Sequence, residues 1–164
     1  MIDNYTFNET YKRFEPHDNK CTYCGEAHMR SMNDCYFVPL FVTNDRTNIV
    51  VYRSVKYSKI LIGIPRCASC KDIHEKASTK GIWIAVGCAI LSIVFLIYNF
   101  TNFHPLITIG GFFATIFGAV FGAKKLTETF IANQDIYTQH DGAETNEVVR
   151  ELVIAGWSFT QPTA

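Results

Sequence analysis

A run of 43 residues, from 81 to 123, contains no Asp, Glu, Lys or Arg. A helix needs about 20 apolar residues to cross a hydrocarbon core roughly 30 Å thick, so the run is long enough for two spans and a turn. We expect spans at 81–98 and 106–123, joined by NFTNFHP, whose Asn and Pro suit a turn at the membrane surface. A buried hairpin of a soluble protein would have the same composition, but the remaining chain is too small to cover both helices.

Basic residues beside this run predict its orientation. Lys71, Lys76 and Lys80 precede the first predicted span, Lys124 and Lys125 follow the second, and the link contains no basic residue. We therefore expect a two-pass integral membrane protein with both termini in the cytoplasm, in the inner membrane if the source is bacterial. The cysteines then lie in a reducing compartment, where metal binding is favoured over disulfide bonding.

Two C-x-x-C pairs are the clearest chemical motif: Cys21-Thr-Tyr-Cys24 and Cys67-Ala-Ser-Cys70, with 42 residues between them. Two intervening residues let both thiolates of a pair reach one ion from a tight turn, and two such turns complete a closed tetrahedral zinc site. Gly25 permits the positive φ that such a turn often needs. The predicted metal ligands are Cys21, Cys24, Cys67 and Cys70, and the predicted cofactor is Zn²⁺.

The elements around these cysteines follow the order knuckle, β-hairpin, and second ligand pair at the start of a helix. Residues 21–76 therefore resemble the broad class of treble-clef and zinc-ribbon-like fingers. The resemblance implies metal binding. It implies no single function, because such fingers bind nucleic acid, contact proteins or serve as structural supports.

Three further residues are candidate ligands: His28, His74 and Cys35. On a helix, His74 would share a face with Cys70, four residues earlier. Four thiolates already complete the set that structural zinc prefers, so we favour both histidines as neighbouring or surface residues. We expect Cys35 to be a buried strand residue and Cys88 a small packing residue in the first span.

Catalysis is the alternative use of the cysteines. Thioredoxin-like chemistry requires one C-x-x-C in a βαβ unit, whereas this chain has two motifs and no parallel β pattern. A catalytic zinc would keep a position open for water beside an acid or base, for which Glu26, Glu75, His28 and His74 are candidates by proximity alone. Because four thiolates close the site, we expect a protein that is not an enzyme.

Composition divides the chain into an N-terminal arm, a zinc-binding domain, a transmembrane hairpin and a cytoplasmic tail, at residues 1–20, 21–78, 79–125 and 126–164. The predicted fold class is α+β: a small zinc-bound antiparallel β domain with a helix, plus a two-helix transmembrane hairpin. The arm is either loosely held or a strand and turn laid on the next domain. Strands are predicted from Tyr36, Asn48 and Lys59, separated by turn signals such as TNDRTN.

The tail segment DGAETNEVVRELVIAGWSF predicts a turn, a helix and a short strand, with Asp141 as the helix cap and Gly156 at the helix end. The tail is acidic, whereas residues 46–80 carry eight Lys or Arg against Asp72 and Glu75. We therefore expect the tail to dock on the zinc-binding domain, with charge only steering the contact.

Small residues recur every fourth position in GGFFATIFGAVFGAKK and form two adjacent rows, Gly110, Ala114, Gly118 and Gly122 beside Gly111, Thr115, Ala119 and Ala123. Such a glycine zipper permits close backbone approach inside a bilayer. Two interpretations remain open. Either the two helices of one hairpin press their small faces together, or copies of the protein associate as a homo-oligomer.

These patterns predict a membrane-anchored, zinc-binding interaction or scaffold protein, with the lipid bilayer and an unidentified protein as its partners. The alternative is a self-assembling membrane effector or channel that uses the glycine-rich second span, and a zinc enzyme is the third hypothesis. The spans contain no ionisable side chain, which argues against a carrier. For the basic segment 46–80 we prefer anionic lipid to nucleic acid as the partner.

Overall fold

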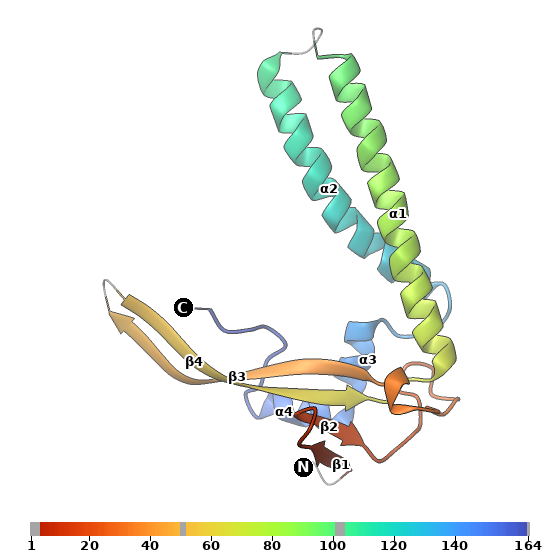
Figure 1. Ribbon diagram of the computed structural model, residues 1–164, viewed down its shortest axis with the longest axis vertical. Helices are drawn as coiled ribbons and strands as arrows, with labels where there is room; N and C mark the ends of the chain where they lie inside the picture. Colours follow the sequence, from red (N-terminus) through yellow and green to blue (C-terminus); the bar gives the residue numbers. More distant parts are fainter. Residues whose placement is uncertain (1–3, 50–51, 101–103, 164) are drawn as a thin grey trace. The chain divides into compact units, whose positions relative to one another are not determined.

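In the 164-residue chain, a computed structural model describes residues 4–49, 52–100 and 104–163. The chain divides into two compact units, the first formed by residues 1–71 with 137–164 and the second by residues 72–136. Figure 1 shows a small sheet with short helices in the first unit and two long helices in the second. The predicted α+β class with two long apolar helices is therefore confirmed.

The sheet has the strand order β1-β2-β4-β3, with β1 at Tyr5–Asn8, β2 at Arg13–Pro16, β3 at Tyr36–Ile49 and β4 at Tyr52–Ile64. Each hairpin, β1–β2 and β3–β4, is antiparallel, but β2 lies parallel to β4 at the pair Phe14–Ile62. The prediction of a wholly antiparallel sheet is corrected at this pair. The physical reason is that β2 leads to the first cysteine pair and β4 to the second, so both strands run toward the same place.

The β3–β4 hairpin replaces the three strands expected from the sequence. The segment TNDRTN is not a turn, because it lies within β3 and pairs with β4 across a register shift between Thr43 and Asp45. Asn44, the extra residue, donates from Nδ2 to Ser58 Oγ at 2.8 Å. Residues 43–46 and 56–59 are exposed, so this part of the hairpin has no buried face and no apolar alternation. The expected strand from Asn48 includes residues 50–51, which lie outside the described residues.

The core of the first unit combines one face of the sheet with the tail. Its most buried aliphatic side chains come from β3, β4 and the last helix of the tail: Val38, Leu40, Ile62, Ile64, Val149 and Leu152. Each such side chain contributes about 1.5–3 kcal/mol when it leaves water. A tail that supplies part of this core is an integral part of the unit.

Two helices form the tail, α3 (Gln139–Thr145) and α4 (Glu147–Ile154), where one was predicted. The cap of α3 is Thr138 rather than Asp141, because Thr138 Oγ1 accepts from Asp141 N at 3.2 Å and donates to Asp141 Oδ2 at 2.7 Å. Asn146 separates the helices by capping α4. Gly156 has a φ of +98° directly after α4, as the predicted helix end requires.

The chain after α4 lies against the edge of the sheet. Ser158 and Phe41 of β3 exchange two backbone hydrogen bonds of 2.8 Å each. Further along, Gln161 Nε2 donates to Tyr57 Oη at 2.8 Å, and Arg46 Nη2 donates to Thr163 O at 3.2 Å. The tail therefore covers part of the β3 edge, which would otherwise expose unpaired backbone groups.

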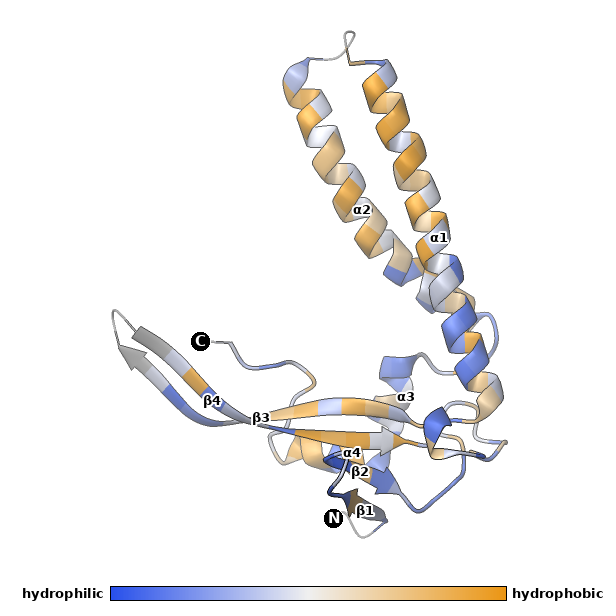
Figure 2. Ribbon diagram, in the orientation of Figure 1, coloured by the Kyte–Doolittle hydropathy of each residue, from blue (hydrophilic) through white to orange (hydrophobic). Residues whose placement is uncertain are grey.

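The second unit is a helical hairpin of α1 (Ala68–Tyr98), which begins in the first unit, and α2 (Pro105–Ala132). The short 3-10 helix η1 (Met32–Asp34) completes the list of described helices. Both α1 and α2 are long and apolar enough to cross a membrane, and both expected spans lie within them. Only 11% and 6% of their most apolar 18-residue windows are buried among the described residues. Figure 2 shows apolar residues along both helices.

The two rows of small residues on α2 have different surroundings. A Cβ added to Gly81 of α1 would lie 3.0 Å from Ala123 O, and one added to Gly111 would meet Leu96 of α1. The row that contains Gly111 and Ala123 therefore faces α1. In the other row, a Cβ added to Gly110, Gly118 or Gly122 would meet no heavy atom within 4 Å among the described residues.

The close contact at Gly81 predicts opposite effects of the same substitution at two positions of α1. Gly81→Ala should lower the unfolding free energy in detergent by about 1–3 kcal/mol, because its methyl group has to displace the α2 backbone. Gly87→Ala is the matched control, since a Cβ there meets nothing within 4 Å, and it should be neutral or stabilising. Thermal unfolding measures both variants, and equal effects would refute the assigned helix contact.

Candidate metal centre

The structure brings the four predicted cysteines together. Cys21 and Cys24 lie in the loop between β2 and β3, while Cys67 and Cys70 lie where β4 leads into α1. Their sulfur atoms all lie within 4.8 Å of one another, and Cys24 Sγ is 4.0 Å from Cys67 Sγ. Cys24 is half-buried and the other three are buried.

Backbone hydrogen bonds hold both knuckles in place. In the first, Gly25 N donates to Cys21 O at 3.0 Å, and Gly25 has a φ of +72°, as its position after the pair suggested. In the second, Cys70 N donates to Cys67 Sγ at 3.4 Å. Thr22 N donates to Pro65 O at 3.0 Å and joins the two knuckles directly. The cluster is thus built from two rigid turns.

The sulfur positions fit one tetrahedral metal ion. Four thiolates at 2.3 Å from a zinc ion have sulfur–sulfur edges of about 3.8 Å. The distance of 4.0 Å between Cys24 Sγ and Cys67 Sγ is close to this value. A disulfide requires sulfurs about 2.05 Å apart, and all six cysteines of the chain are free.

The pKa values of the thiols are compatible with a cation in the cluster. Burial raises the pKa of Cys21, and burial together with the neighbouring sulfur of Cys67 raises the pKa of Cys70. For Cys24, burial alone would raise the pKa, but backbone hydrogen bonds from Ala27 and Glu26 outweigh burial and lower the pKa to about 7. Four adjacent thiolates would repel one another, and a divalent cation at their centre would offset that repulsion.

Tyr23, the residue inside the first knuckle, connects the cluster to the tail. Its side chain is 1% exposed, and burial raises the pKa of its phenol. Its backbone carbonyl accepts from Tyr137 N at 3.2 Å, and its hydroxyl donates to Gln139 O at 3.4 Å. A Cβ on Gly142 of α3 would collide with the Tyr23 ring, so only glycine fits there. Sequence reasoning missed this contact, which joins residues more than 110 positions apart.

The other candidate ligands do not belong to the cluster. His28 is exposed, and His74 is buried on the part of α1 that belongs to the second unit. Cys35 is buried as expected, but it lies between η1 and β3 rather than in a strand; its Sγ donates to Ile64 O at 3.2 Å, and burial raises its pKa to about 12. Cys88 is exposed on α1. The cluster among the described residues is therefore made of thiols alone.

A second group, His140, Asp141 and Glu144 on α3, also places its ligand atoms within 4.8 Å of one another. All three side chains are exposed. His140 Nδ1 lies 3.5 Å from Glu144 Oε1, and Asp141 accepts from the Thr138 hydroxyl. These contacts within one helix account for the group without a metal ion.

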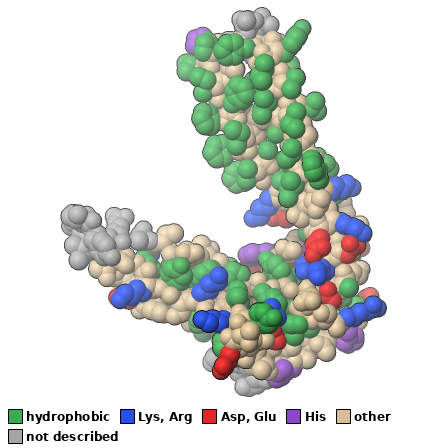
Figure 3. Space-filling view, in the orientation of Figure 1, with side chains coloured by type: hydrophobic (Ala, Val, Ile, Leu, Met, Phe, Trp, Pro, Cys, Tyr) green, Lys and Arg blue, Asp and Glu red, His purple; other side chains and the backbone are tan. Residues whose placement is uncertain are grey.

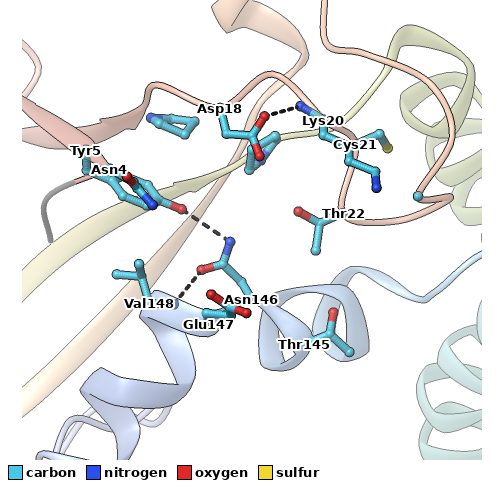
Figure 4. A pocket seen from close by; sticks show the side chains of 13 residues that line it. Asn4, Tyr5, Asp18, Lys20, Cys21, Thr22, Thr145, Asn146, Glu147 and Val148 are labelled. Carbon is cyan, nitrogen blue, oxygen red and sulfur yellow. Dashed lines mark hydrogen bonds between the residues drawn. The ribbon is translucent and has the colours of Figure 1, made fainter. Parts of the chain in front are cut away.

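A pocket of about 330 Å³ lies beside the first knuckle, between β1, the loop that carries Cys21 and the junction of α3 with α4. Figure 4 shows Asn146 reaching from this junction toward Tyr5 of β1. Asn146 Nδ2 donates to Tyr5 Oη at 3.2 Å, and Asn146 Oδ1 accepts from Val148 N and Val149 N. Burial raises the pKa of Tyr5 to about 12. One side chain thus caps α4 and ties the tail to β1.

Comparison with known proteins adds no assignment to this geometry. No protein family, no curated protein and no solved structure matches the chain.

The double role of Asn146 predicts that Asn146→Ala lowers the unfolding free energy of the full-length protein by about 1–2 kcal/mol, because it removes the cap of α4 and the bond to Tyr5. Chemical denaturation in detergent measures the change. Asn19→Ala is the control, since Asn19 is exposed and bonds only through its backbone, to Met29 N. Equal unfolding free energies of the two variants would exclude the capping role of Asn146.

Proposed function

We propose that the protein is a non-catalytic interaction protein, anchored in a membrane by α1 and α2, whose cytoplasmic domain is stabilised by one zinc ion. The observation that carries this proposal is the closed cluster of four cysteine sulfurs at the meeting point of β2, β4 and α1. A set of four protein thiolates leaves no position for a substrate or an activated water, which is the pattern of structural zinc rather than catalytic zinc.

Zinc is favoured by the ligand set and by the compartment. Thiolates are soft ligands that select zinc, copper(I) or iron–sulfur clusters, and a single tetrahedral ion suits sulfurs at these separations. In a reducing cytoplasm the thiols remain available, because disulfides do not persist there. Binding would contribute to folding, since the ion joins segments 42 residues apart in the sequence.

Membrane anchoring is supported by the exposed apolar surface of the second unit. Large apolar side chains such as Leu91, Phe117 and Phe121 are 60–71% exposed on the two helices. A surface of this extent is costly in water and suits a hydrocarbon environment. The lysines at both ends of the charge-free run support cytoplasmic termini.

The outer part of the β3–β4 hairpin is the surface we assign to a protein partner. It extends beyond the pairing with β2 and beyond the Ser158 bridge at Phe41, and its described side chains at 43–46 and 56–59 are exposed, although the end of the tail contacts it at Tyr57 and Arg46. Arg46, Lys56 and Lys59 make this surface basic. A partner with an acidic surface would complement it.

Removal of one ligand tests the zinc proposal. Cys24→Ser should abolish stoichiometric zinc, measured by mass spectrometry of the metal content, and should expose residues 1–71 to limited proteolysis. Cys35→Ser is the matched control, because Cys35 lies outside the cluster, and it should retain one zinc ion per chain. Wild-type protein that is purified free of metal and still resists proteolysis would contradict the proposal.

Self-association through α2 is a second candidate, favoured by the open row of Gly110, Ala114 and Gly118. All three residues are exposed, and the other row already contacts α1. Gly118 also lines a pocket of about 310 Å³ beside α1, which leaves room for a second helix to approach. Small residues in such a row let a second helix approach closely in a bilayer. This candidate includes the self-assembling effector or channel.

The variant Gly118→Leu distinguishes association between copies of the protein from helix packing within one chain. A Cβ at position 118 would meet no heavy atom within 4 Å among the described residues, and the pocket of about 310 Å³ beside it has room for a leucine side chain. The variant should therefore insert and fold normally but lose crosslinking between copies in vesicles. Crosslinking that persists in Gly118→Leu would remove this candidate. Conductance of reconstituted wild-type protein tests the channel form, and the absence of current argues against it.

A further inference from the structure

A pocket of about 230 Å³ lies between α1 and α2 in the second unit, on the side of the lysines. Its lining consists of Ile73, Lys76, Ala77 and Lys80 of α1 with Phe130 of α2 and Gln134 just beyond it. The apolar residues are buried or half-buried, whereas the two lysines and Gln134 are exposed. The pocket therefore combines an apolar floor with a rim of hydrogen-bond donors and positive charge.

The ammonium group of Lys80 is positioned beside this pocket without being neutralised. Lys80 Nζ lies 4.6 Å from the centroid of the Phe130 ring, a cation–π contact that leaves its charge in place. No ion pair of Lys80 occurs among the described residues. Lys76 Nζ is 2.7 Å from Asp72 Oδ2, but both side chains are more than half exposed, so this pair contributes little and can open.

Neighbouring residues place Lys80 at the depth of lipid headgroups. Lys80 is the last charged residue before the 43-residue charge-free run, and Trp83, 70% exposed, follows within one turn. Exposed tryptophans of membrane helices gather at the interface. Gly81 packs on Ala123, so Lys124 and Lys125 of α2 lie at the same level as Lys80. Figure 3 shows hydrophobic side chains over most of the hairpin and Lys or Arg at its base.

Acidic residues of the second unit lie farther from the apolar run than this lysine layer. Glu128 follows Lys125 by about one turn, Asp135 follows it by ten residues and is adjacent to Gln134, and Asp72 and Glu75 precede Lys80 by one to two turns. The charge next to the hydrocarbon is therefore positive. This order suits a leaflet whose lipids carry negative headgroups.

We propose that this pocket binds the headgroup of one anionic phospholipid. The lipid phosphate accepts hydrogen bonds from Lys80 and Lys76, the Gln134 amide bonds headgroup hydroxyls, and headgroup carbons pack on Phe130 and Ala77. A zwitterionic choline headgroup would bring its own cation against the lysines and bind more weakly. The inference rests on the proposed membrane anchoring, because the pocket reaches a lipid only if α1 and α2 span a bilayer.

The test uses full-length protein in a neutral detergent and native mass spectrometry titrations with dioleoyl-phosphatidylglycerol and dioleoyl-phosphatidylcholine. Wild-type protein should retain one phosphatidylglycerol at least about tenfold more tightly than phosphatidylcholine. The double variant Lys76→Gln/Lys80→Gln should lose this preference. Lys124→Gln/Lys125→Gln is the matched control: it removes the same charge at the level of Lys80, but neither residue lines the pocket, and the variant should keep most of the preference.

Each contrary result has a distinct meaning. Equal losses in the two double variants, or equal binding of both lipids to wild type, would show diffuse surface charge and overturn the site. Displacement of the lipid by millimolar glycerol phosphate would assign the pocket to a soluble anion and also overturn it. Extraction of the protein from membranes by alkaline carbonate would refute membrane anchoring itself, whereas a carbonate-resistant protein without lipid preference would refute only this inference.

Discussion

Two cysteine pairs separated by 42 residues form one cluster only if the chain brings both pairs to one place, and the strands of the first unit do so. β2 leads to the first pair and β4 to the second, so these two strands are parallel neighbours within a sheet of antiparallel hairpins. The bond from Thr22 N to Pro65 O closes the two knuckles on each other. The β3–β4 hairpin carries the chain out and back between them.

The tail completes this unit through the same cluster. Tyr23, held between Cys21 and Cys24, contacts Tyr137, Gln139 and Gly142, which lie before and within α3. The buried ring of Tyr23 therefore links the cysteine cluster directly to the tail. Asn146 and Ser158 add contacts to β1 and β3, so the tail depends on three separate parts of the domain.

The second unit has surfaces of different chemical character. One row of small residues on α2 contacts α1, Gly118 and Gly122 of the adjacent row line a pocket beside α1, and many large apolar side chains are exposed. Basic residues lie at the ends of the apolar run, and Lys80 is fixed there by Phe130. In water such a hairpin would expose an extensive apolar surface, whereas in a bilayer each of these surfaces has a suitable environment.

The sequence by itself determined the features that depend on local pattern: two helices from a charge-free run, a four-cysteine cluster from two C-x-x-C pairs, and a helix end at Gly156. These features require only nearby residues and known periods or spacings. The sequence pattern wrongly predicted a turn at TNDRTN, because exposed polar residues in a two-stranded ribbon have the composition of a loop. Tertiary structure alone decided the parallel pairing of β2 with β4, the contacts of Tyr23 with the tail, and which row of small residues on α2 contacts α1. Each of these depends on contacts between residues distant in the chain, and no local pattern records such contacts.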